Sequence, residues 1–401
     1  MVHGPAGRPR LAALTTTFYK GAHIQHIADR LLEGYGWNGR HHRPAVDLVS
    51  LYVDQLHPED LSRERAGRFP NLKIYPTIAD ALTLGGSELA VDGVLLIAEQ
   101  GDYPTNEKEQ KLYPRYSFFK QMAAIFRASG RSVPVFNDKH LSWNWVWARE
   151  MYEIARELNF PLMAGSALPV TRRTPALDLP LGAQVEEAMC VGCSWVDGGD
   201  FHVYETVQAM VERRRGGECG VRWLQAYRGE SFWQAHAEGR WSWDLFEAGM
   251  SRSHQLQSTR AGFNHVFPSL DEMRHIVDDP RAYQYEHLDG LKCTLILLNG
   301  LLADLNFSAR IEGRKELLSA NFHLPAPGAH ATLANFFSPL VNNIEAMFLS
   351  GKPSYPVERT LLTTGLTAAG VESLYQGQQK MTTPHLHIAY QPNPRSTFWR
   401  T

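Results

Sequence analysis

The chain has 401 residues, of which 44% are hydrophobic and 20% are charged, and its formal net charge is −2. The near balance of 40 basic and 42 acidic residues gives no electrostatic reason to expect nucleic acid or an anionic membrane as a partner. No apolar run approaches the ~20 residues needed to cross a bilayer, and four cysteines are too few for a disulfide framework. We therefore expect a cytoplasmic globular protein, most simply of two domains.

Short apolar runs alternate with amphipathic stretches through the first part of the chain. Strands are predicted at residues 10–16, 46–54, 73–77, 92–99, 133–138 and 161–168. Helices are predicted between them at residues 23–35, 58–69, 78–84, 117–130 and 142–159. This alternation is typical of βαβ units and a mostly parallel sheet, in which ligands bind at the carboxyl ends of the strands.

The pattern changes after Pro169, where residues 170–182 form a proline-rich connection. Longer strands are predicted at residues 184–196, 220–229, 293–311 and 316–324, with helices at 198–214, 338–351 and 358–379. We therefore expect a first domain over residues 1–168 and a second, α+β domain over residues 169–401, with a mostly antiparallel sheet.

The turn after the first strand raises the question of nucleotide binding. It reads TTTFYKG over residues 15–21 and lacks the GxGxxG pattern that lets a backbone approach a pyrophosphate. Backbone amides at the start of the next helix, with threonine hydroxyls beside them, are expected to hold the phosphates instead. The candidate cofactor-binding residues of this turn are Thr15, Thr17, Phe18, Tyr19 and Gly21.

Asp54 ends the second strand, where a carboxylate can accept hydrogen bonds from an adenosine ribose. The alternative is that Asp54 only caps the following helix. A carboxylate at this position repels a 2′-phosphate, so the sequence favours NAD over NADP.

Several segments of the chain match, in order and spacing, the pattern of one family. The segments are DGVLLIAE at residues 92–99, ASGRSVPVFNDKHLS at 128–142, GGDFHVYE at 198–205, and the closing stretch at 350–377. Together they resemble the Gfo/Idh/MocA oxidoreductases, relatives of glucose–fructose oxidoreductase and inositol dehydrogenase. The resemblance implies an α/β protein, with an N-terminal Rossmann-like, doubly wound parallel sheet followed by an α+β domain whose open sheet is mostly antiparallel.

The resemblance also implies catalytic roles for Lys139, His202 and Glu205. Histidine is a suitable base for a hydroxyl proton near neutral pH, and an ammonium group stabilises charge that develops on the oxygen. Glu205 follows His202 by three residues on the same helix face, where it would either orient His202 or accept a hydrogen bond from a substrate hydroxyl. The matched positions add four cofactor-binding residues to those of the turn: Ala98, Glu99, Asp138 and Lys139.

Residues 103–116 stand where the family has only a short segment, and they are predicted to form either a substrate-contacting lid or a structural arm. The candidate substrate-binding residues are Tyr103, Asn106, Glu107, Arg172, Arg173 and His202. Cys190 and Cys193 form one CxxC pair without a partner pair nearby, so no metal site is predicted.

Three hypotheses follow for the function. The first is an NAD-dependent oxidoreductase acting on a hydroxyl of a sugar, cyclitol or similar polar metabolite. The second uses transient oxidation for an epimerase, lyase or glycoside-cleaving reaction. The third is a catalytically silent sensor or scaffold, because fold alone does not prove activity. A homodimer or homotetramer is expected, because an open antiparallel sheet needs its outer face covered.

Overall fold

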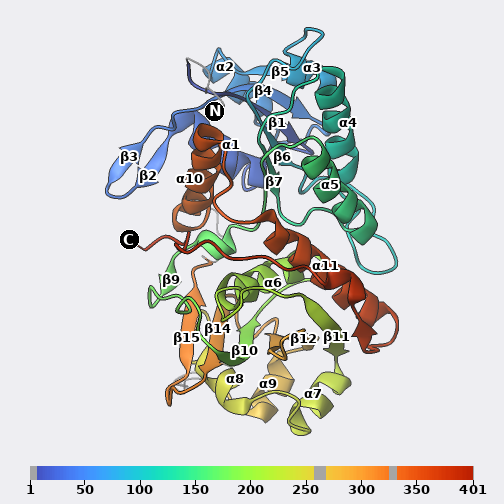
Figure 1. Ribbon diagram of the computed structural model, residues 1–401, viewed down its shortest axis with the longest axis vertical. Helices are drawn as coiled ribbons and strands as arrows, with labels where there is room; N and C mark the ends of the chain where they lie inside the picture. The colour runs from blue at the N-terminus through green and yellow to red at the C-terminus, as the bar shows by residue number, and fades with distance from the viewer. Residues whose placement is uncertain (1–6, 257–267, 325–331, 401) are drawn as a thin grey trace. The chain divides into compact units, whose positions relative to one another are not determined.

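The computed structural model describes residues 7–256, 268–324 and 332–400 (Figure 1). The chain divides into two compact units. Unit 1 comprises Met1–Asn106, Lys111–Ala167 and Thr332–Thr364, and unit 2 comprises Glu107–Gln110, Leu168–Ala331 and Gly365–Thr401. One unit boundary therefore falls beside the predicted border at residues 168 and 169, whereas residues 332–364 join the first unit. The predicted two-domain border stays a prediction.

Unit 1 is built on a six-stranded sheet with the order β5-β4-β1-β6-β7-β8. The strands in chain order are β1 (Arg10–Thr15), β4 (Asp47–Val53), β5 (Lys73–Tyr75), β6 (Gly93–Ile97), β7 (Val135–Asp138) and β8 (Leu162–Gly165). Every neighbouring pair in this sheet is parallel. Counted along the chain, the order is 3-2-1-4-5-6, that of a doubly wound dinucleotide-binding sheet. The predicted α/β architecture is confirmed.

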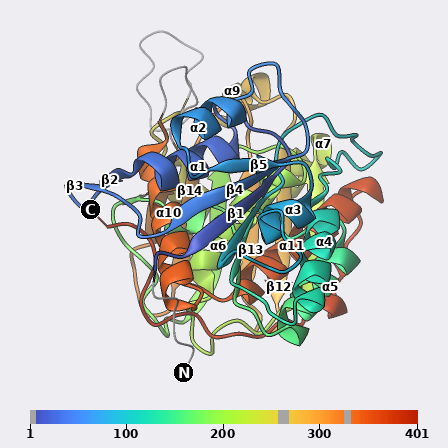
Figure 2. The ribbon, with the colours of Figure 1, turned by 90° about the horizontal axis from the view of Figure 1, so that it is seen from above.

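Helices cover both faces of this sheet, as the view from above shows (Figure 2). On one side lie α1 (His23–Glu33) and α2 (Ser62–Arg68), and on the other lie α3 (Ile78–Thr83), α4 (Arg115–Ala128) and α5 (Trp145–Glu157). Strands β1, β6, β7 and β8 are buried almost throughout because helices shield them on both faces, which explains their continuous apolar runs, whereas the edge strand β5 has no buried residue. The late helix α10 (Ala334–Ser350) packs against α1 within unit 1.

A small hairpin that was not predicted from the sequence follows α1. It consists of β2 (Tyr35–Trp37) and β3 (Arg40–His42), which pair antiparallel. The two connecting residues, Asn38 and Gly39, both have positive φ angles, 48° and 74°. An Asn-Gly pair is the sequence signal of such a two-residue turn.

Unit 2 contains an eight-stranded sheet with the order β16-β11-β12-β13-β10-β14-β15-β9. The strands are β9 (Arg173–Thr174), β10 (Val185–Gly192), β11 (Val221–Arg228), β12 (Arg281–His287), β13 (Lys292–Leu297), β14 (Leu305–Ile311), β15 (Leu318–Phe322) and β16 (Met381–Thr382). Only β10 and β13 run parallel, so the predicted mostly antiparallel sheet is confirmed. The predicted strand at 293–311 is wrong in one respect, because a turn at Gly300, with φ 91°, divides it in two.

Both faces of the unit 2 sheet are covered. Helix α6 (Gly198–Val211) packs on β10, β13 and β14, while α8 (Trp243–Met250) packs on β10, β14 and β15 and α7 (Glu230–Ala237) on β11. Helix α9 (Leu270–Ile276) joins α7 and α8 in a second apolar core, which includes Phe232, Phe246 and Met273. The face that was expected to require a partner subunit is thus covered by the chain itself. The homodimer or homotetramer therefore stays a prediction, and an uncovered sheet face no longer supports it.

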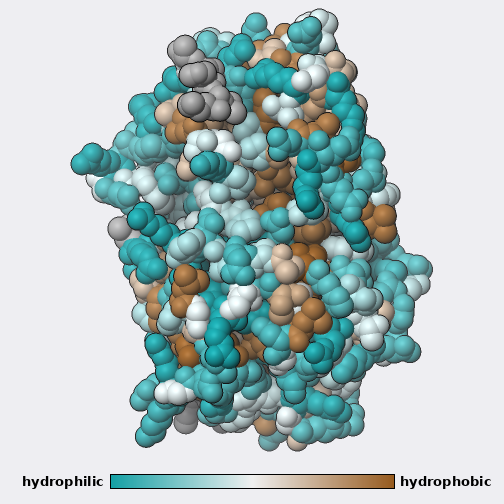
Figure 3. Space-filling model, viewed as in Figure 1, coloured by the Kyte–Doolittle hydropathy of each residue, from teal (hydrophilic) through white to brown (hydrophobic). Residues whose placement is uncertain are grey.

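Helix α11 (Val357–Tyr375) contributes residues to both units, and the short helices η1 (Leu168–Val170) and η2 (Pro384–Leu386) complete unit 2. None of the helices within the described residues is long and apolar enough to cross a membrane. The face drawn in Figure 3 is largely hydrophilic, with apolar residues in smaller groups among the polar ones.

Candidate functional site

The carboxyl ends of four parallel strands meet at one edge of the unit 1 sheet. Strands β1, β4, β6 and β7 end at Thr15, Val53, Ile97 and Asp138. Because the strands are parallel, the residues that follow each of them gather at the same edge. The candidate cofactor residues of unit 1 lie there, on the turns after these strands.

The threonine turn after β1 is packed into the unit. Thr15 Oγ1 donates to the carbonyl oxygens of Thr17 (3.1 Å) and Ile97 (2.9 Å), and Thr16 Oγ1 donates to that of Glu99 (2.7 Å). Phe18 is fully buried. The structure differs here from the expectation that the hydroxyls face a phosphate, because the Thr15 and Thr16 hydroxyls bond main-chain carbonyls instead.

The rest of the turn leads to the start of α1. The Tyr19 ring stacks on the His57 ring with centroids 4.2 Å apart. Gly21 has φ 89°, a conformation that favours glycine, and turns the chain into the helix. The Gly21 amide donates to Gln25 Oε1 (3.2 Å), and the His23 amide, at the first residue of α1, donates to Gln100 Oε1 (3.1 Å). The amides at this helix start therefore face oxygen acceptors.

Asp54 is exposed and accepts two tyrosine hydrogen bonds. The Tyr52 hydroxyl donates to its Oδ1 (2.7 Å) and the Tyr103 hydroxyl to its Oδ2 (2.5 Å). Burial, with the nearby Asp54 charge, raises the pKa of Tyr52 to about 12 and raises that of Tyr103 further, so both hydroxyls keep their protons at neutral pH. The alternative that Asp54 caps the next helix is wrong, because α2 begins only at Ser62.

A buried charged cluster follows β6 and β7. The Glu99 carboxylate bonds the Arg115 guanidinium, and its Oε1 lies 3.4 Å from Lys139 Nζ. These residues are 6%, 0% and 2% exposed, respectively. Burial raises the pKa of Glu99, but the charges of Lys139 and Arg115 outweigh it and hold that pKa below its usual range. Glu99 is therefore an anion at neutral pH, and Ala98, fully buried, precedes it.

Two histidines border this cluster. His23 Nδ1 lies 2.7 Å from Asp138 Oδ2, which joins the start of α1 to the end of β7. His140 is buried, with its Nε2 3.4 Å from an Arg115 nitrogen, and burial followed by the Arg115 and Lys139 charges lowers its pKa well below the usual value. His140 is thus neutral. Lys139 itself has φ 65°, so the chain holds its side chain at an uncommon backbone conformation.

The inserted segment between β6 and α4 contributes residues to both units. Tyr103 and Asn106 belong to unit 1, whereas Glu107 belongs to unit 2, where the Tyr375 hydroxyl bonds its carboxylate. Also in unit 2, Lys108 pairs with Glu372, and Gln110 Nε2 donates to Asp197 Oδ1 (3.2 Å).

Within unit 2, α6 carries His202 and Glu205. The His202 side chain is half-buried and its ring meets the Trp195 ring edge-on at 6.4 Å, whereas Glu205 is fully buried. Trp195 is 61% exposed and lies over Gly199, where an added Cβ would come within 2.7 Å of the indole. Glycine at position 199 therefore allows an exposed aromatic ring beside His202.

The two arginines after the junction differ. Arg172 is exposed, whereas Arg173 is 2% exposed and donates to Asp178 Oδ1 (2.9 Å). The Arg173 guanidinium also lies against the rings of Phe322 and Phe398. Of the two, Arg172 is the one with access to solvent.

Sequence reasoning missed four residues that shape these sites: Tyr52, Gln100, Arg115 and Trp195. The alternation within β4 places Tyr52 two residues before Asp54 on the same strand face, which was a usable signal. Gln100 bonds His23 and Arg115 bonds Glu99, residues that lie far from them in the sequence, so no local pattern predicts these contacts. Within the described residues, no group of three or more His, Cys, Asp or Glu side chains could hold a metal ion.

No family model and no curated protein matches the chain. Solved structures do match it. GenD2 from gentamicin A biosynthesis, in complex with NAD, is 14% identical, with a TM-score of 0.57 over 95% of this chain and 97% of the other. Myo-inositol dehydrogenase from Lactobacillus casei, in complex with NAD(H) and myo-inositol, is 12% identical, with a TM-score of 0.53 over 96% of this chain and 99% of the other.

A Gfo/Idh/MocA family oxidoreductase from Vibrio cholerae is 14% identical, with a TM-score of 0.50 over 92% of this chain and 99% of the other. These likenesses extend over nearly the whole length of each chain. The expected resemblance is confirmed at the level of the fold: the chain has the fold of the Gfo/Idh/MocA family oxidoreductases.

Proposed function

We propose that the protein is an NAD-dependent oxidoreductase that acts on a hydroxyl group of a sugar, cyclitol or similar polar metabolite. The observation that carries the proposal is the parallel sheet of unit 1, whose carboxyl edge presents Asp54 after β4 and Lys139 after β7. The two structural neighbours described with bound NAD or NAD(H), one of them also with myo-inositol, support both the cofactor and the substrate class.

The residues at this edge suit the adenosine half of NAD. Asp54 already accepts two hydroxyl hydrogen bonds, and ribose hydroxyls are donors of the same kind. The His23 amide already donates to a side-chain oxygen, and a phosphate oxygen is a stronger acceptor at a helix start. The donors and acceptors therefore fit the group, although side chains of this chain now engage them.

When bound, NAD supplies the acceptor for the hydride that leaves the substrate carbon. Lys139 would orient the substrate hydroxyl, and Glu99, Arg115 and Asp138 would hold Lys139 and its surroundings in place. The Lys139 ammonium would also stabilise negative charge on the oxygen as the hydroxyl loses its proton.

His202 is the proposed base for that hydroxyl proton, and buried Glu205, one helical turn on, is its proposed positioning residue. Arg172 is retained as a proposed substrate contact because its side chain is exposed. Arg173 is less suited to contact a substrate, because Asp178 and two aromatic rings already enclose its guanidinium.

The test is NADH formation over a panel of sugars and cyclitols, with wild-type protein and the variants Lys139→Met and His202→Ala. Both variants are expected to lower kcat by ~100-fold or more and to leave NAD affinity within a few-fold of wild type. Lys120→Met, on the exposed face of α4, is the control and should keep wild-type turnover. Undiminished turnover in Lys139→Met or His202→Ala would remove the assignment of that residue. A wild-type protein that fails to bind NAD at millimolar concentration would contradict the proposed function itself.

A further inference from the structure

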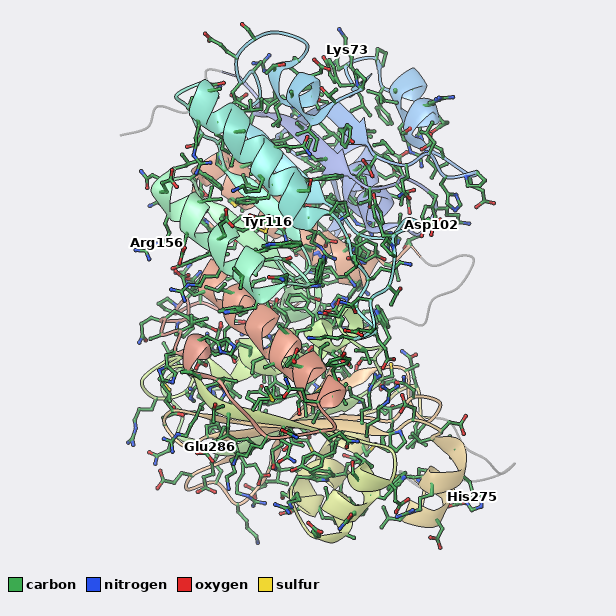
Figure 4. The ribbon with its side chains drawn as sticks, turned by 90° about the vertical axis from the view of Figure 1, so that its right-hand side faces the viewer. Lys73, Asp102, Tyr116, Arg156, His275 and Glu286 are labelled. Carbon is green, nitrogen blue, oxygen red and sulfur yellow. The ribbon has the colours of Figure 1, made fainter. Side chains whose placement is uncertain are left out.

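Four consecutive residues after β6 lie against the proposed adenosine site of unit 1. We define residues 100–103, Gln-Gly-Asp-Tyr, as the plug segment, and Figure 4 labels Asp102 within it. Gln100 Oε1 accepts from the His23 amide, and the Tyr103 hydroxyl donates to Asp54. Between them, the Asp102 amide donates to Gln55 Oε1 (2.8 Å), and Gln55 Nε2 donates back to the Asp102 carbonyl oxygen (3.0 Å).

The surface beneath the plug segment is fixed to the sheet. The amides of Asp54 and Gln55 donate to the carbonyl oxygens of Thr15 (3.0 Å) and Thr16 (2.8 Å), which extends the β1–β4 pairing past the strand ends. Asp54, which Tyr103 engages, and Gln55 are therefore held in place whether or not the plug segment covers them.

The backbone of the plug segment is shaped for this position. Gln100 has φ 66°, uncommon for a residue with a side chain, and Gly101 has φ 101°. A Cβ on Gly101 would come within 2.9 Å of the Tyr103 ring and 3.0 Å of Gln55 Oε1. Glycine at position 101 lets the chain turn tightly, so that Gln100 reaches the start of α1 and Tyr103 reaches Asp54.

The chemistry of the two end contacts resembles that of a nucleotide. The Tyr103 hydroxyl gives Asp54 the kind of donor that a ribose hydroxyl would give. The Gln100 side-chain oxygen gives the His23 amide the kind of acceptor that a phosphate oxygen would give. We propose that Gln100 and Tyr103 compete with the ADP-ribose half of NAD for the His23 amide and Asp54, and so determine how tightly this chain binds the cofactor.

This proposal rests on the proposed function, since it concerns the same cofactor. Asp54 is exposed and Tyr103 only half-buried, so the bond between them can exchange for a ligand bond without uncovering a core. A hydrogen bond of this kind contributes a modest net free energy, so its removal should tighten ligand binding by ~3- to 10-fold.

The experiment compares Tyr103→Phe with Tyr116→Phe in the full chain. Tyr116, labelled on α4 in Figure 4, donates to Glu150 Oε2 at 2.5 Å, as Tyr103 does to Asp54, so both variants lose a tyrosine–carboxylate bond of the same length. Dissociation constants for NAD, ADP-ribose and nicotinamide mononucleotide are measured by quenching of tryptophan fluorescence. Tyr103→Phe should tighten NAD and ADP-ribose by ~3- to 10-fold and leave nicotinamide mononucleotide unchanged, and Tyr116→Phe should alter none of the three.

Hydrogen exchange gives a second, independent readout. The Asp102 amide is protected by Gln55 Oε1, so saturation of the wild type with ADP-ribose should accelerate exchange within the plug segment. An unchanged or weaker ADP-ribose affinity in Tyr103→Phe would overturn the proposal. A weaker affinity would mean that Tyr103 contacts the ligand instead of competing with it. If the wild type binds neither NAD nor ADP-ribose at millimolar concentration, the proposed function fails instead.

Discussion

The Glu99 carboxylate lies between two buried cations, and its replacement by glutamine is a sharp test of the charged cluster. The Glu99→Gln change keeps the size of the side chain and removes its charge, so Arg115, at 0% exposure, loses its carboxylate partner and Lys139, at 2% exposure, loses a neighbouring negative charge. Loss of one partner of a buried ion pair destabilises a protein by about 3–5 kcal/mol.

The chain supplies a matched control in the same unit. Lys120 Nζ lies 2.5 Å from Glu150 Oε1, but these side chains are 43% and 37% exposed. Glu150→Gln should therefore stay within about 1 kcal/mol of wild type. The double variant Glu99→Gln/Lys139→Met should recover part of the lost stability, because it removes one of the two cations that Glu99 faces.

Urea unfolding followed by tryptophan fluorescence measures these differences as shifts of the midpoint at constant slope. The account predicts a large loss for Glu99→Gln, a partial recovery in the double variant, and a small change for Glu150→Gln. Equal midpoints for the two single variants would refute the reasoning that the Glu99 cluster is a buried, charged unit.

Two further predictions concern stability. Burial, and then the Arg30 charge, lowers the pKa of His26 from 6.5 to about 4, so between these pH values the unfolded chain binds a proton that the folded chain does not. Stability should therefore fall by about 3 kcal/mol as the pH drops from 6.5 to 4, and His26→Gln should flatten that part of the urea midpoint–pH curve; an unchanged curve would contradict the assignment. On β6, an added Cβ at Gly93 would come within 2.5 Å of the Phe348 ring, so Gly93→Ala should destabilise the protein by about 1–3 kcal/mol. Gly36→Ala, where nothing lies within 4 Å, should be close to neutral in the same melts, and similar melting temperatures for the two variants would count against the packing described around β6.

The sequence predicted the strands and helices of unit 1 well because each strand is a short apolar run between amphipathic helices. The helix predicted at 23–35 is α1, His23–Glu33, and the strand predicted at 46–54 is β4, Asp47–Val53. The errors have local causes. The hairpin β2–β3 has only three residues per strand, too few to show a periodic pattern, so its Asn38-Gly39 turn was the sole usable signal.

The candidate site was predictable in position but not in its contacts. The end of β4 could be located from the apolar pattern, and Asp54 with it. That Tyr103 bonds Asp54 depends on residues 49 positions apart in the chain, which periodicity cannot bring together. For the same reason, the sequence indicated Lys139 but not the burial of its ammonium beside Glu99 and Arg115.

A crystal structure of the protein grown with millimolar NAD tests the central claim most directly. The account predicts adenosine density at the end of β4, with ribose hydroxyls within hydrogen-bond distance of Asp54, phosphate oxygens at the His23 amide, and the Tyr103 hydroxyl moved away from Asp54. Density in which Tyr103 still bonds Asp54, Gln100 still accepts from the His23 amide, and no nucleotide lies along the carboxyl edge of the sheet would contradict it.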